Sequence, residues 1–294
     1  MTFQDGGSFD SGRVRKRTGG AGKAGGVAVG GGLGIAVIVV VAQLLGVDVS
    51  GLFADSSSPQ SETDLVGCET AERANADSEC RYGWTIESLD AFWAATLPEQ
   101  AGVAYTQPGA VTFSEATTTG CGNASSATGP FYCPADETVY VDVSFFGVLR
   151  DQFGSSGGPL AEEYVVAHEV GHHIEQITGV MSTADRSGTG PESDSVRIEL
   201  MADCLAGMWA SNAATLPDPE TGKPFLEPIS EADLADALSA AEAVGDDRIQ
   251  EAATGSVNPE SWTHGSAEQR QRWFMTGYQG GTFEQCNALT ATTL

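Results

Sequence analysis

Histidine and positive charge are both scarce in this chain. Its 294 residues include 4 histidines and 14 lysines or arginines, against 40 aspartates or glutamates, and the formal net charge is -26. A strongly anionic surface repels phosphate backbones, so this charge balance argues against nucleic acid as a partner. The same charge favours solubility, and attraction of a cationic partner is the second interpretation.

Long apolar runs are rare as well, and only one is long enough to cross a bilayer. Residues 27–46 (VAVGGGLGIAVIVVVAQLLG) carry no charge, and as a helix they would span the hydrocarbon core. We therefore predict one transmembrane helix there, in contact with lipid. A cleaved signal peptide is the rival interpretation, but its apolar region is normally shorter. A buried core helix is the third, and the glycines disfavour it.

The charges on either side of this run predict its orientation. Basic residues precede the run and an acidic body follows it, so the positive-inside rule places the N-terminus in the cytoplasm. We expect a single-pass protein of the cell membrane with its folded domain outside the cytoplasm. The predicted parts are a cytoplasmic basic tail (1–26), a transmembrane helix (27–46), a flexible acidic linker (47–80) and one domain (81–294). The oligomeric state is not indicated.

The chain has six cysteines, which suit an oxidising compartment. Six cysteines allow 15 pairings in principle. Two pairs stand twelve residues apart in loop-like sequence, and elimination leaves the third. The predicted disulfides are Cys68–Cys80, Cys121–Cys133 and Cys204–Cys286. Six buried free thiols are the alternative.

Helical periodicity dominates the chain beyond residue 81. The first helix is expected at 86–97 and should stop before Pro98. Further helical patterns occupy 144–153, 159–179, 194–214, 230–245 and 266–278. Short β-prone runs stand at 110–113 and 138–143, and the second (TVYVDV) alternates as a half-buried strand would. The expected fold class is α+β, a mostly helical domain with a small β-sheet, preceded by the transmembrane helix.

Three of the four histidines fall within the six residues HEVGHH, 168–173. Residues four apart share one face of a helix, so His168 and His172 can offer two imidazoles to one metal ion. Glu169 can reach a water at that ion without binding it, which is the H-E-x-x-H arrangement of zinc peptidases. His173 is expected to flank the site. A surface helix with fortuitous histidines is the competing interpretation.

A catalytic zinc site needs a third protein ligand. Glu175 would have to bend round from the same helix, so the segment SVRIELMADCLAGMW is the better source. Glu199 and Asp203 share a face there, so Glu199 can bind the metal while Asp203 accepts a hydrogen bond from a ligating histidine. A solvated edge of a surface helix is the alternative for these two carboxylates.

The remaining catalytic roles are less constrained by the sequence. We expect Glu169 to act as general base on the attacking water. His264, in WTHGSAEQR, and Tyr164 are candidates for stabilising negative charge on the carbonyl oxygen, although His264 could equally cap a helix or fill the core. The run TVYVDV is the predicted sheet edge for an extended peptide, with a core strand as the alternative.

The chain resembles the bacterial neutral zinc metallopeptidases, also called membrane-anchored predicted metalloproteases. The matching segments are CGNASSATGPFYCP, TVYVDVSFF, AHEVGHHIEQITG, SVRIELMADCLAGMWA, GDDRIQ and WTHGSAEQR, together with the apolar run and a late cysteine. The resemblance covers about residues 81–290. It implies a zincin-like fold, zinc (Zn²⁺) bound by His168, His172 and Glu199, and Glu169 as the base.

The leading hypothesis is a membrane-anchored, extracytoplasmic zinc peptidase that acts on protein or peptide substrates. A non-catalytic envelope protein that keeps zinc for stability is the alternative from another class, and Glu169 distinguishes them because a structural site needs no general base. A zinc amidase acting on cell-wall peptides is the third.

Overall fold

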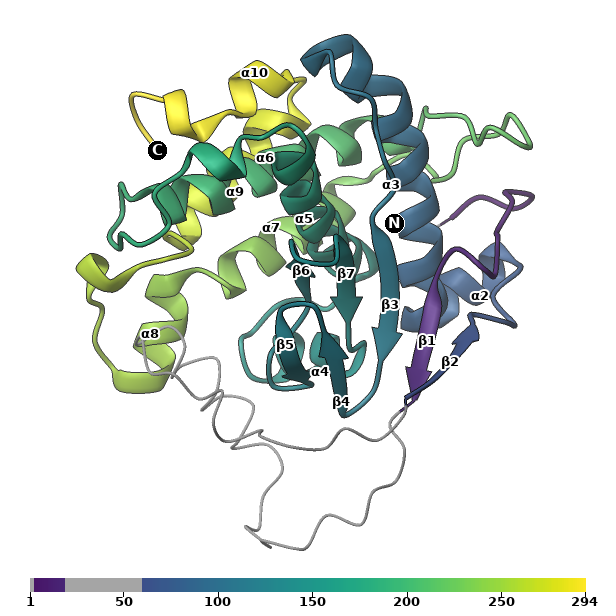
Figure 1. The fold of residues 1–294 in the computed structure, drawn as a ribbon, viewed down its shortest axis with the longest axis horizontal. Helices are drawn as coiled ribbons and strands as arrows, with labels where there is room; N and C mark the ends of the chain where they lie inside the picture. Colours follow the sequence, from purple (N-terminus) through teal and green to yellow (C-terminus); the bar gives the residue numbers. More distant parts are fainter. Residues whose placement is uncertain (1–2, 19–59) are drawn as a thin grey trace, which may run out of the picture.

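The structure is a computed structural model that describes residues 3–18 and 60–294 (Figure 1). It is a mixed α/β fold in which a small sheet packs against a bundle of helices. The described helices of four or more residues are α2 (Ala71–Ala76), α3 (Ser78–Ala101), α4 (Ser144–Asp151), α5 (Pro159–Ile177), α6 (Asp194–Ala213), α7 (Glu231–Ala243), α8 (Asp246–Thr254), α9 (Ala267–Tyr278) and α10 (Phe283–Cys286). Short 3-10 turns, including η2 (Met181–Thr183), join some of them.

The helical periodicity located most of these elements. Helices α4, α5, α6, α7 and α9 lie where they were predicted. The first predicted helix is longer than expected, because α3 runs through Pro98 to Ala101 and ends at Gly102, whose φ is +67°. Pro98 lies in the last turn, where one missing backbone hydrogen bond does not stop the helix.

The main sheet has five strands in the order β2-β1-β3-β7-β6. The strands are β1 (Arg15–Thr18), β2 (Ser61–Asp64), β3 (Gly109–Phe113), β6 (Phe131–Cys133) and β7 (Thr138–Val141), and a separate hairpin is made by β4 (Ala116–Thr119) and β5 (Gly122–Ser125). Strands β1, β3 and β7 are parallel, and the outer strands are antiparallel to their neighbours.

The strand β7 differs from its prediction. All four of its residues are buried, so it is an interior strand covered on both faces and not a half-buried edge. On one face Val139 and Val141 join the main core with the helices, and on the other Tyr140 packs in a smaller apolar cluster. The described edge strand at this end of the sheet is β6.

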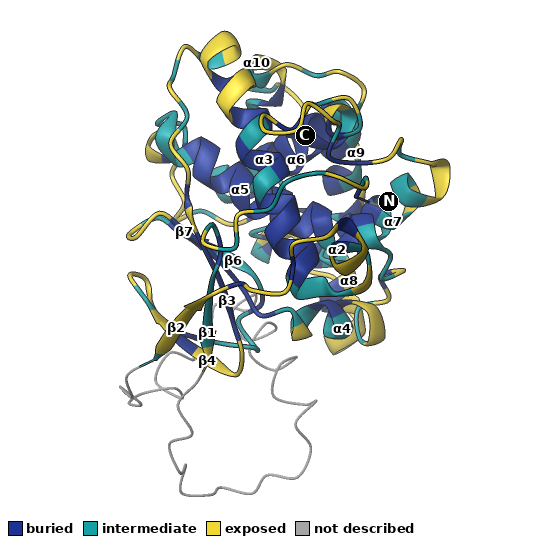
Figure 2. Ribbon diagram, turned by 90° about the vertical axis from the view of Figure 1, so that its right-hand side faces the viewer, coloured by how far each residue is buried: buried dark blue, intermediate teal, exposed yellow. Residues whose placement is uncertain are grey.

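Most of the core lies between the helices. Figure 2 shows that buried residues concentrate in α3, α5, α6 and α9, whereas α8, α10 and strands β1, β2 and β4 are largely exposed or intermediate. Helices α6 and α9 approach closely at Gly207 and Gly277. A Cβ atom at Gly207 would lie 2.0 Å from the carbonyl oxygen of Phe274, and one at Gly277 would lie 1.9 Å from that of Cys204. Only glycine permits this contact.

All three predicted disulfides are confirmed: Cys68–Cys80, Cys121–Cys133 and Cys204–Cys286. The third joins α6 to α10 and so ties the end of the chain to the core.

The N-terminal segment, residues 3–18, is part of the folded domain. Phe3 is buried with its ring edge-to-face against the indole of Trp84, at 5.4 Å between ring centroids, and the ring of Phe9 is stacked with the same indole at 6.2 Å. The guanidinium of Arg13 forms a largely buried ion pair with Asp90 of α3, at 2.5 Å. Strand β1 then pairs with both β2 and β3.

This arrangement corrects the predicted domain boundaries. Residues 15–18 were assigned to a cytoplasmic tail (1–26) and residues 61–64 to a flexible linker (47–80), yet both are strands of the domain's sheet. Helix α2 also lies before the predicted start of the domain at 81. The sequence showed no periodic pattern in these short stretches.

The predicted transmembrane helix and single-pass localisation are contradicted. No helix within residues 3–18 and 60–294 is long and apolar enough to cross a membrane, and the apolar run 27–46 lies outside the described residues. A single crossing at 27–46 would also put β1 and β3 on opposite sides of the bilayer, whereas they are hydrogen-bonded neighbours. The predicted fold class is therefore wrong in placing a transmembrane helix before the α+β domain.

If the N-terminal segment is integral to the domain, Arg13→Ala should destabilise it. The change leaves the buried Asp90 with hydrogen bonds from Tyr105 and Gln107 only, so we expect a loss of about 2 kcal/mol in the free energy of unfolding. Urea denaturation measures it. The control is Arg15→Ala, whose exposed ion pairs with Glu62 and Asp64 should be worth less than about 1 kcal/mol. Equal unfolding midpoints for Arg13→Ala and wild type would contradict the docking.

Candidate metal site

The motif HEVGHH lies in the buried middle of α5. His168 and His172 face the same way, with ring centroids 4.7 Å apart. Opposite them α6 presents Glu199, whose Oε2 lies 3.1 Å from Nε2 of His168 and whose Oε1 lies 3.6 Å from Nε2 of His172. The structure thus brings together the three side chains expected to bind a metal.

The glycine of the motif lets the two helices approach at this point. A Cβ atom at Gly171 would lie 3.0 Å from the Cα of Ala202 and 3.1 Å from its carbonyl oxygen. Helix α6 begins at the side-chain cap of Ser193, which accepts a hydrogen bond from the amide of Val196. Its buried apolar residues then hold Glu199 against α5.

The geometry fits a tetrahedral metal ion. One ligand atom from each of the three side chains lies within 4.8 Å of the other two. Donors at about 2.0–2.2 Å from a tetrahedral zinc ion lie roughly 3.3–3.6 Å from one another, close to the separations of 3.1 and 3.6 Å seen here. Two imidazoles and one carboxylate are a donor set typical of catalytic zinc, which leaves one position open.

The Nδ1 atoms of the two histidines are engaged by other carboxylates, which leaves their Nε2 atoms facing Glu199 as candidate metal donors. Nδ1 of His168 lies 2.8 Å from Oδ1 of Asp203, and Nδ1 of His172 lies 2.9 Å from Oε2 of Glu175. An acceptor behind each ring fixes its tautomer and orientation. The structure places Asp203 as predicted.

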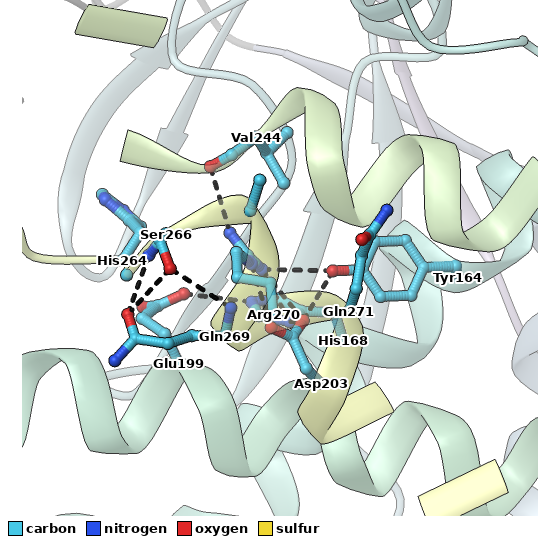
Figure 3. Close-up of polar contacts among 12 residues, drawn as sticks. Tyr164, His168, Glu199, Asp203, Val244, His264, Ser266, Gln269, Arg270 and Gln271 are labelled. Atoms are coloured by element: carbon cyan, nitrogen blue, oxygen red, sulfur yellow. Dashed lines mark hydrogen bonds and ion pairs between the residues drawn. The ribbon is translucent and has the colours of Figure 1, made fainter. Parts of the chain in front are cut away.

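Asp203 is held by more than His168 (Figure 3). Arg270 of α9 binds both of its oxygens, at 2.9 and 3.0 Å, and the hydroxyl of Tyr164 donates to Oδ1 at 2.5 Å. Burial alone would raise the pKa of Asp203, but the adjacent guanidinium and imidazole outweigh it and hold the pKa below its usual value. Asp203 therefore remains an ionised acceptor.

Glu175 lies behind His172 as Asp203 lies behind His168, a role that the sequence did not indicate. Its side chain is fully buried, it contacts Nδ1 of His172, and its Oε1 has no hydrogen-bond partner. Burial raises the pKa of Glu175, against the influence of His172. A carboxylate three residues after a ligating histidine was the available signal, but spacing alone did not show that it lies behind the ring.

The three donors line a pocket of about 360 Å³. Glu169 lines the same pocket and accepts no hydrogen bond from another described residue. Apolar side chains from several elements surround the donors, among them Phe131, Phe145, Val165, Met181, Val244 and Ile249. Edge strand β6 contributes Phe131 and Tyr132, so the sheet edge beside the site is β6 and not the predicted TVYVDV.

His264 also lines this pocket. Its position depends on Asp246, which the sequence analysis did not single out. Oδ2 of the buried Asp246 accepts hydrogen bonds from the amides of Thr263, His264 and Gly265, at 2.7 to 3.0 Å, and Oδ1 lies 3.3 Å from Nδ1 of His264. The loop backbone is thereby fixed, with the imidazole at the pocket.

Two residues of the predicted set have other contacts. His173 is fully buried and points away from the site, with Nε2 donating to the carbonyl of Thr106 at 2.7 Å and Nδ1 lying 3.0 Å from the hydroxyl of Tyr132. Burial lowers the pKa of His173. The hydroxyl of Tyr164 is taken up by Asp203, so Tyr164 supports the histidine rather than facing a carbonyl oxygen.

Comparison with known proteins identifies the family. The family model described as "Putative neutral zinc metallopeptidase" matches residues 2–289. The chain belongs to this family. Its resemblance to that family, inferred from the motifs, is confirmed, and the matched range includes the N-terminal segment that the fold places in the sheet.

Several relatives match along most of their length. Uncharacterized protein Rv2575 of Mycobacterium tuberculosis and uncharacterized protein Mb2605 of Mycobacterium bovis are each 50% identical over 258 residues, 86% of this chain and 86% of the relative. Uncharacterized protein YpfJ of Escherichia coli is 39% identical over 263 residues, 87% of this chain and 86% of its own. No solved structure matches the chain, so the zincin-like fold stays a prediction.

The carboxylate behind His172 can be tested by Glu175→Gln. Loss of its charge weakens the fixed orientation of the imidazole, so we expect the affinity for zinc to fall roughly 10- to 100-fold. Competition with a chromophoric chelator measures it. Glu163→Gln is a matched control, since Glu163 is also fully buried in α5 but does not line the pocket. Equal zinc affinities for Glu175→Gln and Glu163→Gln would contradict the role.

Proposed function

We propose that the protein is a zinc-dependent peptidase that hydrolyses peptide bonds in the pocket between α5, α6 and β6. The observation that carries this proposal is the convergence of His168, His172 and Glu199 in a pocket that also holds Glu169. Within the described residues, no fourth His, Cys, Asp or Glu belongs to the donor group, so the site has the open position of a catalytic centre. A purely structural zinc site would fill this position with a fourth protein ligand.

Zinc held by these three side chains would lower the pKa of a water molecule and polarise the carbonyl of the scissile bond. The chain's own residues supply the rest. The Glu169 carboxylate takes a proton from the attacking water and returns it to the leaving amine. His264 directs its free Nε2 toward the carbonyl oxygen as negative charge develops there, and Asp246 positions the ring.

The surroundings of the same pocket support the proposal that it binds a peptide. Within the part of the chain that the structure describes, β6 is the last strand of the sheet on this side, so an extended peptide can add to it through backbone hydrogen bonds. The apolar side chains around the donors, such as Phe145 and Val165, would bury a large apolar side chain next to the scissile bond. We therefore propose peptides with a bulky apolar residue at that position as substrates.

The proposal is tested by Glu169→Gln, which keeps the shape of the side chain but removes the base. Peptide hydrolysis should fall about 10²- to 10⁴-fold, while zinc content stays at that of the wild type, because Glu169 is not one of the donors. Digestion of a fluorogenic peptide library and elemental analysis of the purified variant provide the two readouts.

Glu268→Gln, an exposed change on α9 outside the pocket, is the control and should cleave like wild type. Purified cell wall is digested in parallel. Release of cell-wall peptides without cleavage of the library would replace the peptidase with an amidase. Undiminished hydrolysis by Glu169→Gln would refute the role of the base.

A further inference from the structure

Arg186 has no ion-pair partner among the described residues, in a chain with an excess of acids. Acidic side chains outnumber basic ones by 40 to 14, so most basic groups find a partner. Every other lysine or arginine in residues 3–18 and 60–294 forms an ion pair or donates to a backbone carbonyl. The guanidinium of Arg186 has no partner among the described residues.

The backbone that carries Arg186 is nevertheless fixed. Arg186 lies between η2 and α6, in a loop held by the first turn of α6. The hydroxyl of Ser195 donates to the carbonyls of Arg186 and Gly188, at 3.1 and 2.9 Å, and Asp194 accepts from the amide of Asp185 at 2.8 Å. The free guanidinium therefore stands on an anchored loop and not on an unattached one.

Arg186 lines the same pocket as the three metal donors. The other arginine of this pocket, Arg270, is buried and neutralised by Asp203. Neither Glu169 nor Glu199 pairs with Arg186, although both line the pocket. Arg186 is thus the arginine of the pocket that can form a new ion pair with a bound molecule.

We infer that Arg186 binds a carboxylate of the substrate, so that the enzyme prefers peptides with a negative charge near the cleaved bond. This inference rests on the proposed peptidase function and names its substrate class. A guanidinium can bind a carboxylate through two parallel hydrogen bonds, which gives orientation as well as affinity. The acidic body repels anionic peptides at a distance, but salt screens that repulsion beyond about 10 Å at 0.1 M. The preference for a substrate therefore depends on the short-range ion pair with Arg186. The carboxylate is either the C-terminus of the peptide or an acidic side chain.

The test compares peptides of one apolar core sequence with zinc-loaded full-length protein. The reference peptide is neutral and amidated, one set has a free C-terminal carboxylate, and another set stays amidated but carries glutamate at successive positions. Wild type should cleave one carboxylate set with kcat/KM about tenfold above the reference. Preference for the free C-terminus identifies a chain-end substrate, and preference for glutamate identifies an acidic side chain.

Two variants assign the preference to the side chain. Arg186→Ala should lower kcat/KM for the preferred peptides about tenfold, through KM, and leave the neutral reference unchanged. Arg186→Glu should favour a lysine-bearing peptide instead. Arg150→Ala is the matched control, because Arg150 is exposed, pairs with its neighbour Asp151 and lies outside the pocket. It removes the same charge and should change neither value.

Binding separates this inference from the proposed function. Fluorescence anisotropy of labelled peptides with Glu169→Gln should show the same carboxylate preference without cleavage, and the added Arg186→Ala should abolish it. Equal binding and cleavage of neutral and anionic peptides would overturn the inference and leave the peptidase intact. Carboxylate-selective binding that depends on Arg186, with no cleavage of any peptide by wild type, would support the site and overturn the peptidase function.

Discussion

The carboxylate of Asp203 joins three helices at the centre of the molecule. It belongs to α6, it accepts hydrogen bonds from Tyr164 and His168 of α5, and it forms a two-point ion pair with Arg270 of α9. A buried charge is tolerated only when it is paired and hydrogen-bonded. Loss of the contacts from α9 would remove the positive charge that compensates Asp203, and loss of those from α5 would remove its other hydrogen bonds. The packing of the core and the orientation of His168 therefore depend on the same carboxylate.

Close helix packing and covalent links hold this centre in place. Gly171 lets α5 approach α6 next to His172, and Gly207 and Gly277 let α6 approach α9. The disulfide of Cys204, the residue after Asp203, fixes α6 to the end of the chain. A pocket set in such a core holds its donor atoms before a metal or substrate arrives, which lowers the cost of ordering them on binding.

The parts that could be predicted from the sequence have local patterns. Helical spacing located α5 and α6, and the four-residue spacings His168–His172 and Glu199–Asp203 indicated which side chains share a face. The role of Glu175 could not be predicted in this way. A carboxylate three residues after His172 can either bend round to bind the metal or accept a hydrogen bond from Nδ1 of His172. Asp246 was missed because its contacts with the loop at His264 span about eighteen residues of chain.

The N-terminal segment, residues 3–18, shows most clearly what local sequence patterns cannot predict. Strand β1 is four residues long, and its parallel partner β3 lies more than ninety residues away, so no local period marks it. The apolar run at 27–46 has a strong local pattern, but the transmembrane topology inferred from it conflicts with the pairing of β1 and β3.

The central claim is that His168, His172 and Glu199 bind zinc, and zinc K-edge X-ray absorption of the purified protein at neutral pH tests it most directly. The account predicts only nitrogen and oxygen donors at about 2.0–2.2 Å, with scattering from two imidazoles; a sulfur shell near about 2.3 Å, or fewer than two imidazoles, would contradict it.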